Sequence, residues 1–152
     1  TRCATKNDRI RVPNDNLILL IPESLVNQDQ KTSCTWGYYY PDLLVTCDQR
    51  DRLNKQYKNY PCLIIEVLSE STEARDRGVK FANYQTLESL QEYVLINQAE
   101  KRVEVFRRTD RQFWLLQTLT DNDILELQSI NLSIPVTAIY EGVELAPDST
   151  SV

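Results

Sequence analysis

The chain of 152 residues contains no histidine. This absence excludes Ser-His-Asp and Cys-His catalysis, imidazole ligation of metals and the commonest general base. Any chemistry must therefore use carboxylates, lysine, tyrosine or a metal ion held by oxygen atoms. Methionine is also absent, the initiator included, and we expect the chain to be a fragment or a processed product.

Long apolar runs and paired cysteines are missing too. The longest apolar run covers residues 17–21, far short of the roughly 18 residues that span a bilayer. The polar start shows no secretory signal. The four cysteines form no CxxC pair, which disfavours a zinc cluster. Two of them fall in expected strands, where a free cysteine packs as a small apolar residue, and we expect a reducing, cytoplasmic setting.

The charge balance is acidic, with a formal net charge of −5. Loose binding to nucleic acid depends on lysine and arginine that neutralise phosphates, so this balance does not favour it. An acidic pocket nevertheless suits a metal-dependent nuclease, and a local basic rim can accompany an acidic total. The length and the 41% hydrophobic content predict one globular domain with a real core.

The order of predicted elements is strands, then a helix, then strands, which indicates a mixed α/β or α+β domain. Expected strands, rich in β-branched and aromatic residues, cover residues 8–12, 17–21, 38–47, 62–68, 92–96, 102–107, 113–119, 124–127 and 132–134. The polar stretch 22–37 predicts a loop, and the charged stretch 48–59 predicts a surface loop or a frayed helical turn. A helix is expected from Ser71 or Thr72 to about residue 86, and a short one over residues 136–140. The tail 146–152 should fray.

One carboxylate, Glu66, interrupts the apolar strand 62–68. A continuous apolar strand is typical of a sheet centre, where a buried charge needs pairing or a metal. The alternative is a strand with one open face and Glu66 in solvent. Asp42 stands in the aromatic and apolar strand 38–47 and presents a similar choice. Either it is held by a partner, or it lies at a strand edge and caps a turn.

The helix that follows places Asp76, Lys80 and Tyr84 on one stripe. The structural reading is an ordinary ion pair between Asp76 and Lys80, worth a few tenths of a kcal/mol, with Tyr84 in the core. The combination with Asp42 and Glu66 points to chemistry instead. Two carboxylates on neighbouring strands can chelate Mg²⁺ or Mn²⁺.

Two further groups complete this predicted metal site. The backbone carbonyl of Val67, directly after Glu66, can supply a third oxygen to the ion. A lysine at the same point can orient or deprotonate a water and stabilise charge on a phosphate. None of these steps needs histidine, which agrees with the composition.

Three segments carry a resemblance to a known family: YYPDLLVTCD, YPCLIIEVLSESTEARDRGVKFANY and LQEYVLINQAEKRVEVFRR. Together they make residues 39–108 resemble the Uma-two family of endonucleases (also catalogued as a domain of unknown function), within the PD-(D/E)XK nuclease superfamily. The resemblance implies a single restriction-endonuclease-like domain, with a mixed central sheet flanked by helices, over residues 1–152. It also implies that part of the N-terminus is lacking, because the family carries a preceding helix and hairpin.

The resemblance assigns roles to the candidate residues. Asp42 would be the aspartate of the PD motif and Glu66 the acid of (D/E)XK. Leu68 stands where the simple pattern has lysine, so Lys80 on the helix would be the substitute. Asp76 and Tyr84 would support the site, and the two serines of the intervening turn, Ser69 and Ser71, would touch the metal shell or a phosphate.

The implied function is a divalent-metal-dependent endonuclease acting on DNA phosphodiesters. The alternative is a catalytically inactive module on the same fold that binds nucleic acid or a protein partner. The acidic total and the Leu68 departure favour that alternative. The aromatic stretch 36–40 and the strands after residue 90 offer surface for a homodimer, unless these aromatics are core.

Overall fold

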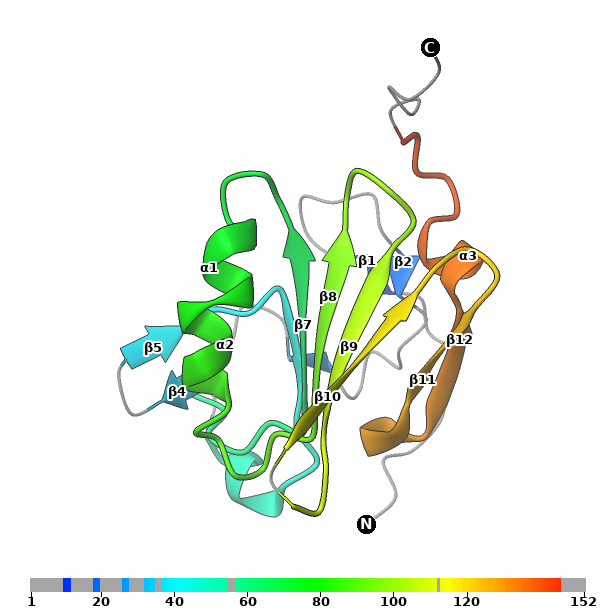
Figure 1. Ribbon diagram of the computed structural model, residues 1–152. Coiled ribbons are helices and arrows are strands. Elements are labelled where there is room, and N and C mark those ends of the chain that lie inside the picture. Colours follow the sequence, from blue (N-terminus) through cyan, green and yellow to red (C-terminus); the bar gives the residue numbers. More distant parts are fainter. Residues whose placement is uncertain are drawn as a thin grey trace.

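A six-stranded mixed sheet forms the centre of the computed structural model (Figure 1). The structure describes residues 10–11, 18–19, 26–27, 32–34, 37–54, 57–111 and 113–145. Across the sheet the strand order is β10-β9-β8-β7-β6-β3. All neighbours are antiparallel except β7 and β8, which run parallel. The strands are β3 (Val26–Asn27), β6 (Leu43–Val45), β7 (Leu63–Leu68), β8 (Glu92–Asn97), β9 (Val103–Arg108) and β10 (Trp114–Leu119).

Shorter elements surround this sheet. Three two-stranded pairs are β1 (Ile10–Arg11) with β2 (Ile18–Leu19), β4 (Thr32–Cys34) with β5 (Gly37–Tyr39), and β11 (Ile124–Leu127) with β12 (Leu132–Pro135). The helices are α1 (Glu73–Arg77), α2 (Val79–Tyr84) and α3 (Val136–Ile139). Figure 1 shows α1 and α2 on one side of the sheet, and α3 with the β11–β12 hairpin on the other.

Both faces of β7 are covered, and all six of its residues are buried. Two hydrophobic clusters explain this burial. Ile64 and Leu68 pack under the helices with Phe81 and Tyr84. The alternate residues of β7 pack on the other face, against side chains of the β11–β12 hairpin and α3. The apolar run of residues 62–68 therefore predicted a central strand correctly.

Several predicted elements needed correction. The strand expected over residues 38–47 is divided into β5 and β6 by Pro41, which has no N–H to donate to a ladder. The stretch 22–37, expected to be a loop, contains β3, β4 and the start of β5. The helix expected up to about residue 86 is broken at Gly78 into α1 and α2. The tail 146–152 lies outside the described residues, as do residues 1–9.

The two cysteines expected inside strands lie just outside them, Cys47 after β6 and Cys62 before β7. The expectation that both are free holds for only one of them. Cys62 is a free thiol, and burial raises its pKa to about 11. Cys47 is disulfide-bonded, so treating it as a free apolar residue was wrong. In the part of the chain that the structure describes, no helix is both long and apolar enough to cross a membrane.

Candidate active site

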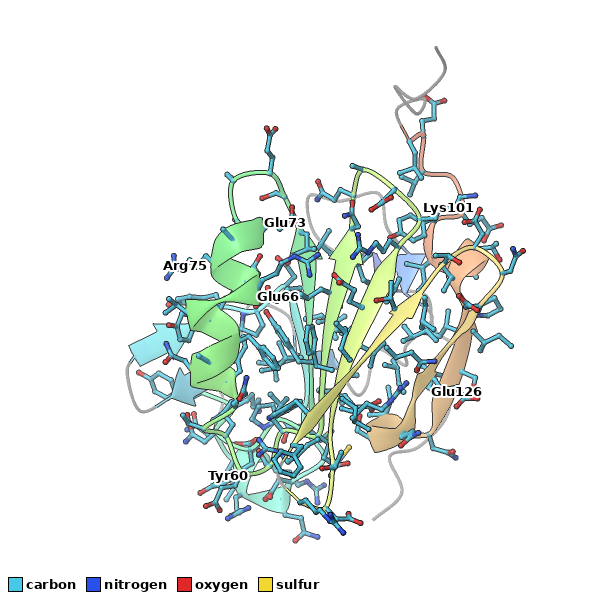
Figure 2. The ribbon with its side chains drawn as sticks, in the orientation of Figure 1. Tyr60, Glu66, Glu73, Arg75, Lys101 and Glu126 are labelled. Carbon is cyan, nitrogen blue, oxygen red and sulfur yellow. The ribbon has the colours of Figure 1, made fainter. Side chains whose placement is uncertain are left out.

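Glu66 lies in the middle of β7 and faces the α1–α2 layer. The residues two places before and after it, Ile64 and Leu68, belong to the hydrophobic cluster under these helices. Alternate residues of a strand share one face, so Glu66 points the same way. Figure 2 shows its label between the helices and the sheet. Only 2% of its side chain is exposed, which excludes the alternative of a solvent-facing acid.

Both carboxylate oxygens of Glu66 have partners from other parts of the chain. The Lys80 Nζ atom lies 2.6 Å from Oε1. The Tyr84 hydroxyl donates to the same oxygen at 3.0 Å. The backbone N–H of Asp42 donates to Oε2 at 3.2 Å. The structure therefore brings together the acid and the lysine that the sequence places 14 residues apart.

Asp42 stands just before β6, at the edge of the paired region. Its Oδ2 accepts a hydrogen bond of 2.8 Å from the Val67 N–H. The β6–β7 ladder ends at the pair Leu43–Ile65, so Val67 lies beyond the residues of β7 that pair with β6. In an extended strand the N–H and C=O of one residue point to the same side. The Val67 carbonyl is therefore on the Asp42 side, where a third oxygen ligand was expected.

A break in the helix lies between Asp76 and Lys80, but the two side chains remain in contact. Gly78 has φ −103° and ψ −103° and joins α1 to α2. A Cβ atom there would lie 3.0 Å from the Ala74 carbonyl oxygen, so a side chain would force a shift. Across this joint Lys80 Nζ stays 3.2 Å from Asp76 Oδ1. The Asp76 carbonyl accepts a 3.0 Å hydrogen bond from the hydroxyl of Tyr93.

The surroundings of the cluster raise the pKa of both Lys80 and Glu66. The lysine is therefore held in its protonated form, and the glutamate is a weaker acid than usual. Burial raises the pKa of Glu66 to about 7, and the opposing effect of Lys80 does not cancel it. The negative charges of Asp42 and Asp76 push in the same direction as burial. For Lys80, burial works against the charged form, but Glu66 and then Asp76 outweigh it and raise the pKa. Burial also raises the pKa of Tyr93.

The residues around Glu66 suit a divalent cation. Glu66 and Asp76 both contact the Lys80 ammonium, and the Asp42 backbone is hydrogen-bonded to Glu66. When all these groups are ionised, the three carboxylates exceed the one ammonium by two negative charges. Carboxylate and carbonyl oxygens are the ligands that Mg²⁺ and Mn²⁺ prefer. Within the described residues, no group of three or more His, Cys, Asp or Glu side chains could hold a metal ion. Two carboxylates would therefore need the Val67 carbonyl and water to complete a coordination shell.

The remaining predicted residues lie apart from this cluster. The Ser69 hydroxyl contacts those of Ser71 and Thr72, at 3.2 and 2.9 Å, in the turn after β7. Ser69 also lines an open cleft of about 430 Å³ at the carboxyl ends of β7 and β8. Leu68, in the position of the usual lysine, is 3% exposed and belongs to the core.

Two supporting groups were missed by reasoning from the sequence. Tyr93 on β8 holds the Asp76 carbonyl, and Arg77 links α1 to Glu104 on β9 at 2.5 Å. Glu104 and Phe106 stand two residues apart on β9, and alternate residues of a strand share one face. That alternation was the available signal. It did not reveal that Glu104 is buried, with 5% of its side chain exposed.

The mixed α/β fold of this chain is shared with a solved structure. A solved structure described as "a putative nuclease belonging to DUF820" from Anabaena variabilis ATCC 29413 has a TM-score of 0.59 to this chain. The likeness covers 76% of this chain and 67% of that one, at 15% sequence identity, so it concerns the fold alone.

The family follows from the sequence match. A family model described as "Uma2: Putative restriction endonuclease" matches residues 14–137, and the chain belongs to that family. Two relatives come from Synechocystis sp. (strain ATCC 27184 / PCC 6803 / Kazusa), both named as uncharacterized proteins. The protein slr1290 is 45% identical over 109 residues, 72% of this chain and 57% of its own length. The protein sll1609 is 36% identical over 100 residues, 63% of this chain and 56% of its own. The chain thus spans little more than half the length of these curated relatives.

Proposed function

We propose that this protein is a divalent-metal-dependent endonuclease that hydrolyses phosphodiester bonds in DNA. The observation that carries the proposal is the convergence on Glu66 of Asp42, Lys80 and Tyr84, which come from separate segments of the chain. A purely structural ion pair would need only two of these groups. Membership in a family described as restriction endonucleases supports the same class of reaction.

Each residue has a distinct role in this proposal. Asp42, Glu66 and the Val67 carbonyl would hold Mg²⁺ or Mn²⁺. The ion would lower the pKa of a bound water and polarise the phosphoryl oxygens. Lys80, whose pKa is raised, remains an ammonium. It therefore donates hydrogen bonds that orient the water and stabilise negative charge on the phosphate, and the role of general base does not suit it.

The supporting residues hold the side chains of Lys80 and Glu66 in position. Tyr84 donates to the Glu66 oxygen that also meets Lys80, which fixes the rotation of the carboxylate. Asp76 provides a second contact for the ammonium, and Tyr93 fixes the Asp76 backbone. Ser69 and Ser71, in the turn after β7, are proposed contacts to the metal shell or to a phosphate.

The test is cleavage of a supercoiled plasmid with Mg²⁺ or Mn²⁺. Glu66→Ala and Lys80→Ala should each lower the rate by about 100-fold or more, the scale seen when a charge-stabilising group is removed from an active site. Glu92→Gln is the matched control, because Glu92 is a buried carboxylate paired with Arg107 outside the cluster. Thermal unfolding shows that each variant is folded. Equal cleavage by wild type and both site variants would identify a contaminant and end the proposal.

A non-catalytic module is the second candidate, favoured by the net charge of −5 and by Leu68. Titration calorimetry with Mn²⁺ separates the two. Binding that disappears in Asp42→Ala supports the nuclease. Absent metal binding, together with metal-independent binding of DNA, supports the module.

A homodimer is proposed on one further observation. The strand β10 is the edge of the main sheet, and Leu115 and Leu116 on it are 63% and 53% exposed. An exposed apolar edge is a surface for pairing with another chain. Size-exclusion chromatography with light scattering gives the mass directly, and a monomer at all concentrations would refute the dimer.

A further inference from the structure

Tyr39 joins the segment that leads into Asp42 to the helix that carries Lys80. It is the last residue of β5, and only two residues separate it from Asp42. Its hydroxyl oxygen accepts a hydrogen bond from the side-chain amide of Asn83 on α2. Its ring packs edge-on against Tyr84, the next residue of α2, with ring centroids 5.4 Å apart. One side chain therefore makes two contacts with the end of α2.

The helix α2 depends on such contacts because it is short. Its six residues make fewer than two turns, and a helix of this length is not stable by itself in water. Arg108 of β9 donates to the carbonyl oxygens of Gln85 and Leu87, just past the end of α2. Tyr39 anchors the same end from β5. In Figure 1, α2 lies between β5 and the strands of the main sheet.

The anchored helix carries both groups that meet Oε1 of Glu66. The Lys80 ammonium and the Tyr84 hydroxyl lie 2.6 Å and 3.0 Å from this oxygen. Asp42 is tied to β7 without the help of α2, by its hydrogen bonds of 3.2 and 2.8 Å with the Glu66 carboxylate and the Val67 N–H. Looser docking of α2 would therefore withdraw Lys80 and leave the proposed metal ligands in place.

We propose that Tyr39 is a positioning residue that holds Lys80 at the proposed active site by docking α2. The inference rests on the proposed nuclease function and adds a residue that acts on catalysis through the helix. It requires a separation of two properties that general damage to the fold would not produce. The turnover number depends on Tyr39, whereas the affinity for the divalent metal does not.

Acetylation of lysine amines by a water-soluble ester, followed by mass spectrometry, tests the docking of α2 without metal or substrate. The Lys80 side chain is 13% exposed and should react slowly in the wild-type protein. Lys101, 38% exposed, is the internal reference. Tyr39→Leu should raise the relative labelling rate of Lys80 by about 10-fold or more, because a hydrogen bond and an aromatic pair are lost. Tyr39→Phe keeps the ring and should raise it by about 3-fold.

A double-mutant cycle assigns the smaller effect to the bond with Asn83. Asn83→Ala should raise Lys80 labelling by about 3-fold, as Tyr39→Phe does. The double variant should be no worse than either single variant, because both changes remove the same bond. Independent, multiplying effects would overturn this bond as the anchor. These two variants also test the proposal if Tyr39→Leu does not fold in a thermal unfolding experiment.

Tyr140→Phe is the matched control. The Tyr140 hydroxyl donates to the Asn97 carbonyl at 2.7 Å, and its ring belongs to the hydrophobic cluster on the face of the sheet opposite to α2. The same chemical change is thus made away from the helix. It should leave the labelling of Lys80 at the wild-type rate, and a rise as large as in Tyr39→Phe would overturn the specific role of Tyr39.

Hydrolysis of bis(p-nitrophenyl) phosphate with Mn²⁺ connects the docking to catalysis. Tyr39→Leu should lower kcat by about 10-fold or more, a part of the loss expected when the charge-stabilising lysine is removed. Titration calorimetry should give a Mn²⁺ dissociation constant within about 3-fold of the wild-type value, a difference below 1 kcal/mol. Wild-type labelling or wild-type kcat in Tyr39→Leu, or equal losses of kcat and Mn²⁺ affinity, would overturn the positioning role alone. Absent hydrolysis of this diester and of plasmid by the wild-type protein would instead reject the nuclease.

Discussion

Replacing Glu66 by glutamine should remove a pH-dependent loss of folding stability that we expect for the wild-type protein. Burial, in opposition to Lys80, raises the pKa of Glu66 from 4.5 to about 7. Between these values the unfolded chain has released the proton and the folded protein has kept it. The folded state then binds more protons, so the free energy of unfolding falls as the pH rises. One pKa unit is worth 1.36 kcal/mol, so the loss is about 3 kcal/mol above pH 7 or so.

Urea denaturation from about pH 4.5 to about pH 8, without divalent metal, measures this loss. The difference between wild type and Glu66→Gln should change by about 3 kcal/mol over the range, a large part of an ordinary domain stability. Mg²⁺ at about 100 times its dissociation constant should restore about 2.7 kcal/mol to wild type near pH 8. Parallel pH profiles for wild type and Glu66→Gln would refute the reasoning.

Two other substitutions test the supports of the site. Tyr84→Phe removes the hydroxyl that donates to Glu66 Oε1, so the Glu66 pKa should rise further and the midpoint for Mn²⁺ binding should move to higher pH. Calorimetry over a pH series measures this midpoint, and an unchanged value would contradict the role of Tyr84. Glu104→Gln should lower the free energy of unfolding by about 1 to 3 kcal/mol, because Arg77 and Arg102 lose a buried charged acceptor. Urea denaturation measures the loss, and wild-type stability would show that this pair does not hold α1.

Much of the central sheet could be predicted because its strands have simple patterns. The continuous apolar run of β7 and the alternation of Val103 and Val105 on β9 both follow from burial. The short strands β3 and β4 were missed because polar segments of two or three residues have no clear period. Their strand character comes from pairing partners, such as β6 for β3, and a single stretch of sequence does not contain that information.

The candidate site shows the same division. The buried position of Glu66 and the shared stripe of Asp76, Lys80 and Tyr84 follow from local patterns. The contact of 2.6 Å between Lys80 and Glu66 depends on how the helices dock, which no spacing along the chain determines. The resemblance to a family suggested this contact. The Asp42–Val67 bond likewise depends on where the β6–β7 ladder ends.

The position of the lysine on α2 has a consequence for how the proposed active site can come apart. In the simple motif the acid and the lysine lie two residues apart on one strand, so their spacing survives as long as that strand does. Here the spacing is a property of packing between the sheet and two short helices joined at Gly78. Short peripheral elements open more easily than a central sheet. Heat or mild denaturant would therefore separate Lys80 from Glu66 while the sheet is intact, and the proposed catalysis would end before the fold does.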